Sequence, residues 1–166
     1  MRWRVVLSPI GDLGVAVDEA GVCAISFDGA PAGGERGDDE LLAAAAEQLR
    51  SYFAGELTEF DLPLSVRRGG DFERAVWSEL AAIPYGAMRT YGEVAAAVGG
   101  PSDRPTDPTG ARAVGAACNR NPLPIVVPCH RVVGAGGKLV GFGGGLARKR
   151  HLLELEARVT LEHTWR

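Results

Sequence analysis

Short segments of alternating apolar and polar or small residues open the chain. They cover residues 2–7, 13–17 and 22–27, and turns rich in glycine, proline and aspartate separate them. Alternation with a period of two is typical of strands that bury one face. The three segments therefore predict an antiparallel meander.

Helical periodicity follows a glycine- and proline-rich loop at residues 29–38. Apolar residues three and four positions apart predict helices over residues 39–54, 71–82, 91–99, 110–120 and 146–157. Residues 61–66 form either one more strand or an extended connector. The sequence RRGGD at 67–71 is the best candidate for a boundary. We therefore expect an α/β domain over 1–68, with a small antiparallel sheet plus a helix, and a mostly helical domain over 69–166.

The helical part has the outline of a helix-turn-helix. Thr90 and Glu93 have the spacing of a capping box at the start of the helix over 91–99. The helix over 110–120 is slim because most of its residues are glycine and alanine, and a slim helix can approach a nucleic-acid backbone. An ordinary helix hairpin gives the same pattern. The connector of about ten residues is also longer than the usual three- or four-residue turn.

The composition excludes several classes of protein. The chain of 166 residues has three cysteines and no C-x-x-C pair, so neither a disulfide framework nor a zinc site is indicated, and we expect no metal. A reduced cytoplasmic location is the natural setting. The N-terminus lacks the features of a signal peptide. No apolar stretch approaches the roughly 20 residues that span a membrane, so we expect no membrane contact.

Charge is distributed unevenly along the chain. The net charge of −3 combines an acidic first part with a basic second part, and residues 108–153 contain seven Lys or Arg and no Asp or Glu. Such a surface suits nucleic acid, because each neutralised phosphate releases counterions. A solvated basic face is the simpler alternative.

Candidate chemistry follows a predicted buried strand. Three β-branched residues at 125–127 predict that strand, Pro128 ends it, and Cys129 and His130 come next. A thiol reacts as thiolate and needs a base or a cation. Neighbouring side chains of a strand point to opposite faces, so the pair can cooperate only if the chain turns at Pro128. An inert core cysteine is the alternative, and we interpret Cys23 and Cys118 in that way.

A histidine base is commonly oriented by a carboxylate. Glu154 and Glu156 on the last helix are the best candidates. Asn121 could support the turn before Cys129 or donate a hydrogen bond toward its sulfur.

Together these segments resemble the methylated-DNA–protein-cysteine methyltransferases, also called O6-alkylguanine-DNA alkyltransferases. The resemblance rests on NPLPIVVPCHRVVGAGGKLVGFGGGLARKRHLLELE, on FERAVWSELAAIPYGAMRTYGEVAAAVG and on ARAVGAACNRNP. It covers residues 71–157 closely, whereas the N-terminal part is similar only in type. It implies a ribonuclease-H-like first domain and a winged-helix-like second domain.

The resemblance implies single-turnover transfer of an alkyl group from O6 of guanine, and also O4 of thymine, in double-stranded DNA. Cys129 would attack the alkyl carbon of a flipped-out base and keep it as a thioether. His130 would take the thiol proton through a water molecule, and Glu156 would orient the imidazole. Tyr91 would donate toward the departing guanine, and Asn121 would hold the turn. No cofactor is implied, and the protein would act as a monomer, with cooperative binding on DNA left open.

DNA binding and base recognition are implied at further residues. Arg112 resembles the arginine that fills the gap left by the flipped base, in a family that binds the minor groove. The other residues implied in DNA binding are Ala111, Gly115, Arg120 and Thr90. The residues implied in the substrate pocket are Val133, Gly143, Phe142, Pro124 and Arg131.

Two features depart from the family pattern. The Gly99–Thr109 connector is several residues longer than usual, and it precedes Arg112. Phe142 stands where many members have tyrosine, which removes a hydroxyl near the pocket.

Three other functions fit parts of the sequence. A non-catalytic damage binder would lack the reactive cysteine, and Cys129 argues against it. A cysteine hydrolase using Cys129, His130 and Glu156 would need an oxyanion hole and leave the basic stretch unexplained. A transcription regulator would need a ligand-sensing domain, and none is evident.

Overall fold

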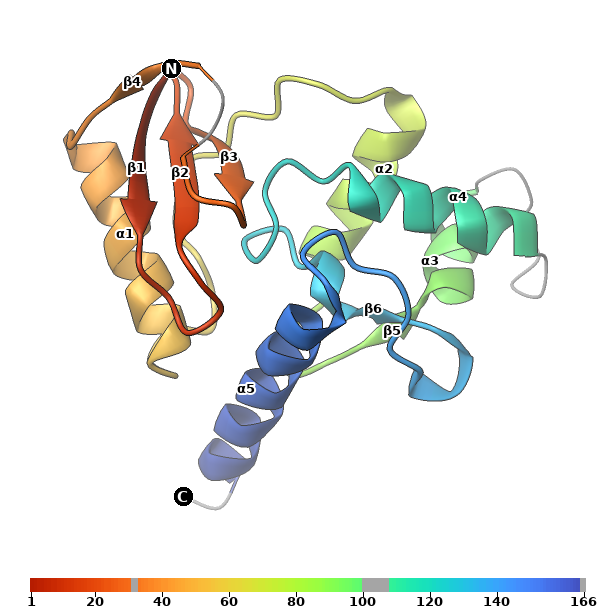
Figure 1. The fold of residues 1–166 in the computed structure, drawn as a ribbon. Helices are drawn as coiled ribbons and strands as arrows, with labels where there is room; N and C mark the ends of the chain where they lie inside the picture. Colours follow the sequence, from red (N-terminus) through yellow and green to blue (C-terminus); the bar gives the residue numbers. More distant parts are fainter. Residues whose placement is uncertain (31–32, 100–107, 165–166) are drawn as a thin grey trace. The chain divides into compact units, whose positions relative to one another are not determined.

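The chain forms two compact units, Met1–Arg67 and Arg68–Arg166. The structure is a computed structural model that describes residues 1–30, 33–99 and 108–164 (Figure 1). Among these residues no helix is both long enough and apolar enough to cross a membrane.

A small sheet forms the centre of the first unit. Strands β1 (Arg2–Val6), β2 (Leu13–Val17) and β3 (Val22–Ser26) pair antiparallel, which confirms the predicted meander. A fourth strand, β4 (Glu35–Arg36), pairs parallel with β1 inside the predicted loop, and the order is β3-β2-β1-β4. Two residues at a sheet edge are too few to give a periodic signal. Residues 61–66 are an extended connector that meets the sheet at a single bridge, between Val22 and Leu64.

One helix packs on this sheet. Helix α1 (Glu40–Phe53) begins after Asp39, whose carboxylate accepts a hydrogen bond from the Leu42 backbone N–H. Its buried residues recur at helical spacing and contact β1, β2 and β3. They are Leu42, Ala45, Ala46, Leu49 and Tyr52. The predicted α/β arrangement of a small sheet plus a helix is confirmed.

Three helices pack together in the second unit (Figure 1). They are α2 (Asp71–Ala81), α3 (Tyr91–Val98) and α4 (Pro108–Asn119). The Thr90 hydroxyl accepts a hydrogen bond from the Glu93 N–H, and the Glu93 carboxylate accepts one from the Thr90 N–H, so the predicted capping box is confirmed. Most of the long connector before α4, residues 100–107, lies outside the described residues.

Short parallel pairing links the start of α3 to the segment that follows Cys129. Strand β5 (Arg89–Thr90) pairs with β6 (Val132–Val133), which directly follows the 3-10 helix η1 (Cys129–Arg131). A second 3-10 turn, η2 (Ala135–Gly137), and a glycine-rich segment then lead to α5 (Leu146–Thr164). The last helix is two turns longer than the sequence pattern indicated, because its final turns are largely exposed and carry little apolar periodicity.

The predicted strand at 125–127 is wrong. These residues form a tight turn, and Ile125 has a positive φ of 75°. The Val127 N–H donates to the Leu123 carbonyl oxygen over 2.8 Å, as in one isolated helical turn. Prolines at 122, 124 and 128 cannot donate to a strand ladder, which outweighs the β propensity of the three β-branched residues.

Candidate active site

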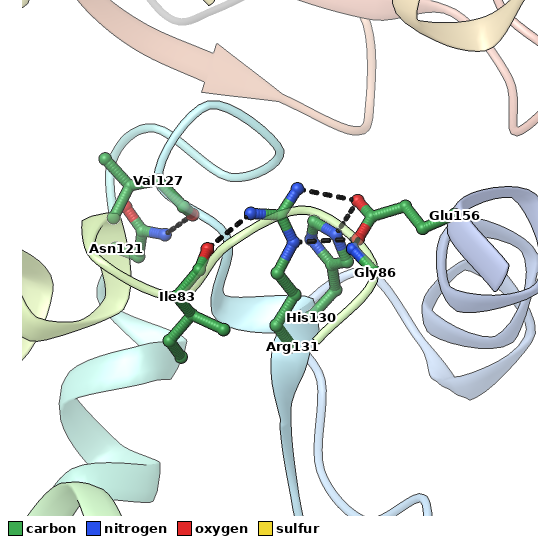
Figure 2. A network of polar contacts seen from close by, with 7 residues as sticks. All are labelled: Ile83, Gly86, Asn121, Val127, His130, Arg131 and Glu156. Carbon is green, nitrogen blue, oxygen red and sulfur yellow. Dashed lines mark hydrogen bonds and ion pairs between the residues drawn. The ribbon is translucent and has the colours of Figure 1, made fainter. Parts of the chain in front are cut away.

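Asn121 holds the turn that leads to Cys129. Its side-chain amide donates to the Val127 carbonyl oxygen over 2.8 Å (Figure 2). Its side-chain oxygen accepts from the Leu123 N–H over 2.9 Å. One side chain thus satisfies backbone groups at both ends of the turn. This turn determines the position of the residues that follow Pro128.

Cys129 and His130 lie on the 3-10 helix rather than on a strand. The Arg131 N–H donates to the Pro128 carbonyl oxygen over 3.0 Å, so the chain turns at the residue where cooperation between thiol and imidazole requires it. Cys129 is 5% exposed and His130 is completely buried. Both are therefore shielded from bulk water.

Glu156, from α5, is the carboxylate that reaches His130. Its Oε2 lies 2.7 Å from His130 Nε2, and the Arg131 guanidinium donates to Oε1 over 2.7 Å and to Oε2 over 3.0 Å (Figure 2). Burial raises the pKa of Glu156, but hydrogen bonds from His130 and Arg131 outweigh burial and lower the pKa to about 2. Glu156 is therefore an anion at neutral pH. Glu154, the other candidate, is exposed on the same helix.

The arrangement leaves His130 one free ring nitrogen. Burial lowers the pKa of His130 more than the hydrogen bond and charge of Glu156 raise it, so the ring is neutral at neutral pH. With Nε2 facing the carboxylate, Nε2 carries the proton and Nδ1 has the lone pair. Nδ1 is buried and has no hydrogen-bond partner among the described residues. It is positioned as a base.

Cys129 rests as a thiol in this environment. Burial raises its pKa more than the hydrogen bond from Asn121 and the charge of Lys149 lower it. Nucleophilic attack therefore requires a base, and His130 is the adjacent one. Cys118 on α4 is also buried, and burial raises its pKa to about 12, so it is the less reactive kind of thiol.

Tyr91 opens α3 with its ring against α4. Its Cε1 lies 3.9 Å from the position that a Cβ at Gly115 would take, so the slim helix leaves room for the ring. The hydroxyl donates to the carbonyl oxygens of Val140, over 3.0 Å, and Gly141, over 3.3 Å. Burial raises the pKa of Tyr91, which keeps the phenol protonated.

Arg131 contacts the carboxylate rather than a pocket. Besides Glu156, its guanidinium donates to the Ile83 carbonyl oxygen over 2.7 Å and lies 5.5 Å from the centre of the Tyr85 ring. Its side chain is buried, so we assign it to the Glu156 network in place of the substrate pocket. The other residues expected in the pocket lie on segments that flank Cys129: Pro124 and Val133 are buried, Phe142 is partly exposed and Gly143 is exposed.

The residues expected to bind DNA lie on α4 and at the start of α3. Arg112 is exposed, and Ala111 and Gly115 are partly exposed. Arg120, at the end of α4, is exposed and lies 3.6 Å from the Glu73 carboxylate. The Thr90 hydroxyl is engaged in capping α3.

The sequence pattern missed Lys149, which it counts only among the seven basic residues of the stretch 108–153. Lys149 is completely buried, and its ammonium contacts Val132, Val140, Gly141 and Tyr91. Helical spacing was the available signal, since Lys149 lies three residues before Leu152 and seven before Glu156, on the buried face of α5. Among the described residues no group of three His, Cys, Asp or Glu side chains could hold a metal ion.

Comparison with known proteins adds independent evidence. Residues 1–66 match the ribonuclease-like domain of 6-O-methylguanine DNA methyltransferase, and residues 71–158 match its DNA binding domain. A methylated-DNA–protein-cysteine methyltransferase of Methanosarcina acetivorans is 44% identical over 94% of this chain and 98% of its own length. That of Mycolicibacterium paratuberculosis is 58% identical over 70% of this chain, a match that spans 66% of the relative's length.

Among solved structures, Mycobacterium tuberculosis OGT in complex with DNA is similar with a TM-score of 0.84 and 45% identity, over 96% of this chain and 94% of that one. The likeness extends over both units and agrees with the fold class expected from the sequence. The domain matches, the similar relatives and the similar solved structure all indicate the family that residues 128–131 and their surroundings resemble. The chain therefore belongs to the 6-O-methylguanine DNA methyltransferase family.

Proposed function

We propose that this protein repairs DNA by transferring an alkyl group from O6 of guanine, or O4 of thymine, to the sulfur of Cys129. The observation that carries the proposal is the buried chain of groups from Cys129 through His130 to Glu156, in a family whose relatives are named methylated-DNA–protein-cysteine methyltransferases. The domains 1–68 and 69–166 are its proposed functional parts, and the second carries the chemistry.

The proton of the thiol leaves first. His130 Nδ1 takes it from Cys129 Sγ through a bridging water, and the anionic Glu156 stabilises the imidazolium that forms. Arg131 keeps Glu156 ionised and oriented, so the carboxylate is not itself protonated. The thiolate then attacks the alkyl carbon. A carbon–sulfur bond forms as the carbon–oxygen bond to guanine breaks.

The electron pair of the broken bond goes to guanine. The Tyr91 hydroxyl donates a hydrogen bond toward the base, which stabilises the developing negative charge. The proton that His130 took from the thiol balances that charge and passes to the departing guanine through water. The product on the protein is a thioether, which has no acidic proton and no good leaving group. Each molecule therefore reacts once.

The target base must leave the helical stack, because its alkyl carbon is inaccessible inside the duplex. Extrusion costs a few kcal/mol. The slim helix α4 would lie in the minor groove, with Arg112 in the gap left by the base and Ala111, Gly115, Arg120 and Thr90 near the backbone. The turn segment with Pro124 would form a wall of the pocket with Phe142. Backbone groups at Val133 and Gly143 would read the guanine edge.

The first test is an intact mass of the protein after incubation with a duplex that contains one methylated guanine. We expect a gain of one methyl group per molecule, mapped to Cys129. Cys129→Ala should abolish the transfer and still bind the duplex, because the thiol is needed for bond formation only. Cys118→Ala is the matched control and should transfer normally.

Other outcomes point to other functions. Tight binding to the lesion with no mass change would indicate a damage binder. Repeated turnover of an ester substrate would indicate a cysteine hydrolase.

We further propose that the protein works as a monomer. We also propose a reduced cytoplasm as its location, since its nucleophile is a thiol. Light scattering of the free protein tests the monomer.

A further inference from the structure

A cavity in the second unit lies beside the Glu156 network, and no step of the proposed reaction uses it. Its volume is about 300 Å³, at the lower end of the range for sites of small organic molecules. The lining comes from the segment that follows α2, from α5 and from one residue of the segment before α5. The apolar lining residues are Gly86, Ala87, Met88, Leu139, Leu153 and Ala157.

Contacts at Gly86 fix one wall of this cavity. Gly86 has a positive φ of 82°, and a Cβ at this position would collide with the Thr160 side chain, so its backbone packs directly on α5. The Gly86 N–H also donates to Glu156 Oε1 over 3.4 Å (Figure 2). Glu156 itself lines the cavity, while its Oε2 contacts His130. The cavity therefore shares Glu156 with the proposed active site.

Two opposite charges stand next to the apolar lining. Arg150 and Glu154 lie four residues apart on α5, are exposed and also line the cavity. Within the part of the chain that the structure describes, neither side chain makes a hydrogen bond or an ion pair. A basic residue four positions before an acidic one is the less favourable order for a pair within a helix. Both charges are therefore free to pair with a ligand.

We propose that this cavity binds a small zwitterion with an apolar body, of the class of the apolar α-amino acids. The apolar body would fill the cavity and cover Met88, which is 54% exposed in the free protein. The carboxylate of the ligand would pair with Arg150, and its ammonium would pair with Glu154. A ligand with a single charge would meet one of these side chains with a charge of the same sign. The inference does not depend on alkyl transfer.

Nuclear magnetic resonance of the isotope-labelled full chain tests this, with L-phenylalanine as the probe. We expect saturable shifts at the backbone amides of Gly86, Ala87, Leu153 and Ala157, with a dissociation constant of about 1 mM or lower for a ligand of this size. Glycine lacks the apolar body and should not bind. Phenylpropanoate and phenylethylamine each lack one charge and should bind about two- to fivefold more weakly than the probe.

Variants locate the site. Ala157→Leu places a larger side chain in the cavity from an exposed helical position, so it should abolish binding. Arg150→Gln and Glu154→Gln should each weaken binding by about two- to fivefold, because each removes one exposed ion pair with the probe.

The matched control is a second pair on the same helix. Arg158 and Glu162 have the same order and spacing and are exposed, but they do not belong to the described residues that line the cavity. Arg158→Gln and Glu162→Gln should therefore bind the probe as the wild type does.

Several results would overturn the inference. They are the absence of a saturable shift, shifts that map to other residues, unchanged binding by Ala157→Leu, and equal weakening by the two pairs of charge variants. Methyl transfer is measured on the same wild-type sample. A wild type that binds the probe and transfers no methyl group would refute the proposed function and leave this site in place.

Discussion

At the scale of single residues, the site depends on how buried charges are satisfied. The Glu156 carboxylate is 2% exposed, and its two oxygens accept from His130 and Arg131. Removing one partner of such a pair leaves the other charge buried and uncompensated. Asn121 satisfies buried polar groups of the backbone, because its side-chain amide hydrogen-bonds to both ends of the turn before Cys129.

Glu156 should make stability depend on acid pH. The pKa of Glu156 falls from an ordinary 4.5 to about 2 in the folded protein. A depressed pKa stabilises the fold above pH 4.5, and this stabilisation is lost as the pH falls toward 2. It corresponds to about 3 kcal/mol. We expect Glu156→Gln to lower the free energy of unfolding by about that amount at neutral pH and by much less at about pH 3.

Urea denaturation of both proteins at each pH measures the difference. Glu154→Gln, an exposed carboxylate on the same helix, is the control and should follow the wild type at both values. A difference between wild type and Glu156→Gln that stays constant as the pH falls would contradict the assignment.

At the scale of elements, helix ends and turns place the functional groups. The capping box of Thr90 and Glu93 starts α3 at Tyr91, whose hydroxyl is the proposed hydrogen-bond donor. The parallel pairing of β5 with β6 brings the same end of α3 next to the segment that follows Cys129. The position of Tyr91 therefore depends on local features that are readable in the sequence.

The cap itself can be tested. Thr90→Ala should lower the free energy of unfolding by about 1 kcal/mol, because the Glu93 N–H loses its acceptor. Thr90→Ser keeps the hydroxyl, and serine caps helices at least as well as threonine, so the free energy of unfolding should not fall. Chemical denaturation of the three proteins decides this, and equal losses for both substitutions would exclude capping as the cause.

At the scale of the whole molecule, charge and the slim helix favour DNA as the partner. Residues 108–153 hold seven basic side chains and no acidic one, but Arg131 and Lys149 are buried and cannot face a phosphate. The remaining five include Arg112, in the first half of α4, and Arg120, directly after its last residue. The basic stretch therefore combines exposed cations, which suit a polyanion, with buried cations that contact Glu156 and backbone carbonyl oxygens.

Arg112 should matter for duplex DNA and not for the chemistry. We expect Arg112→Ala to slow methyl transfer from a duplex by about 10-fold or more, because an extruded base returns to an unfilled gap. The reaction with free alkylguanine should change less than about twofold, as is usual for a distant surface residue. Single-turnover rates on both substrates test this. If Arg112→Ala slowed both reactions equally, Arg112 would have no specific role in holding the duplex open.

Much of the fold was predictable because it depends on local patterns. The meander, helix α1, the capping box and the small residues of α4 each follow from spacing and side-chain type. Cys129, His130 and Asn121 were also identified as candidates, since few residues of the required chemistry lie near Pro128. Glu156 was one of two candidate carboxylates, and the resemblance to the family favoured it over Glu154. Their catalytic roles stay predictions until the mass experiment is done.

Tertiary contacts account for the features that spacing misjudged. Residues 125–127 form a turn despite their β propensity, because the surrounding prolines cannot donate to a strand ladder and Asn121 holds the turn with two hydrogen bonds. Spacing did not single out Lys149, because local sequence does not reveal the carbonyl oxygens that residues 132, 140 and 141 present to it. Local sequence encodes helices, caps and strands, whereas the partners of a buried charge come from segments that only folding brings together.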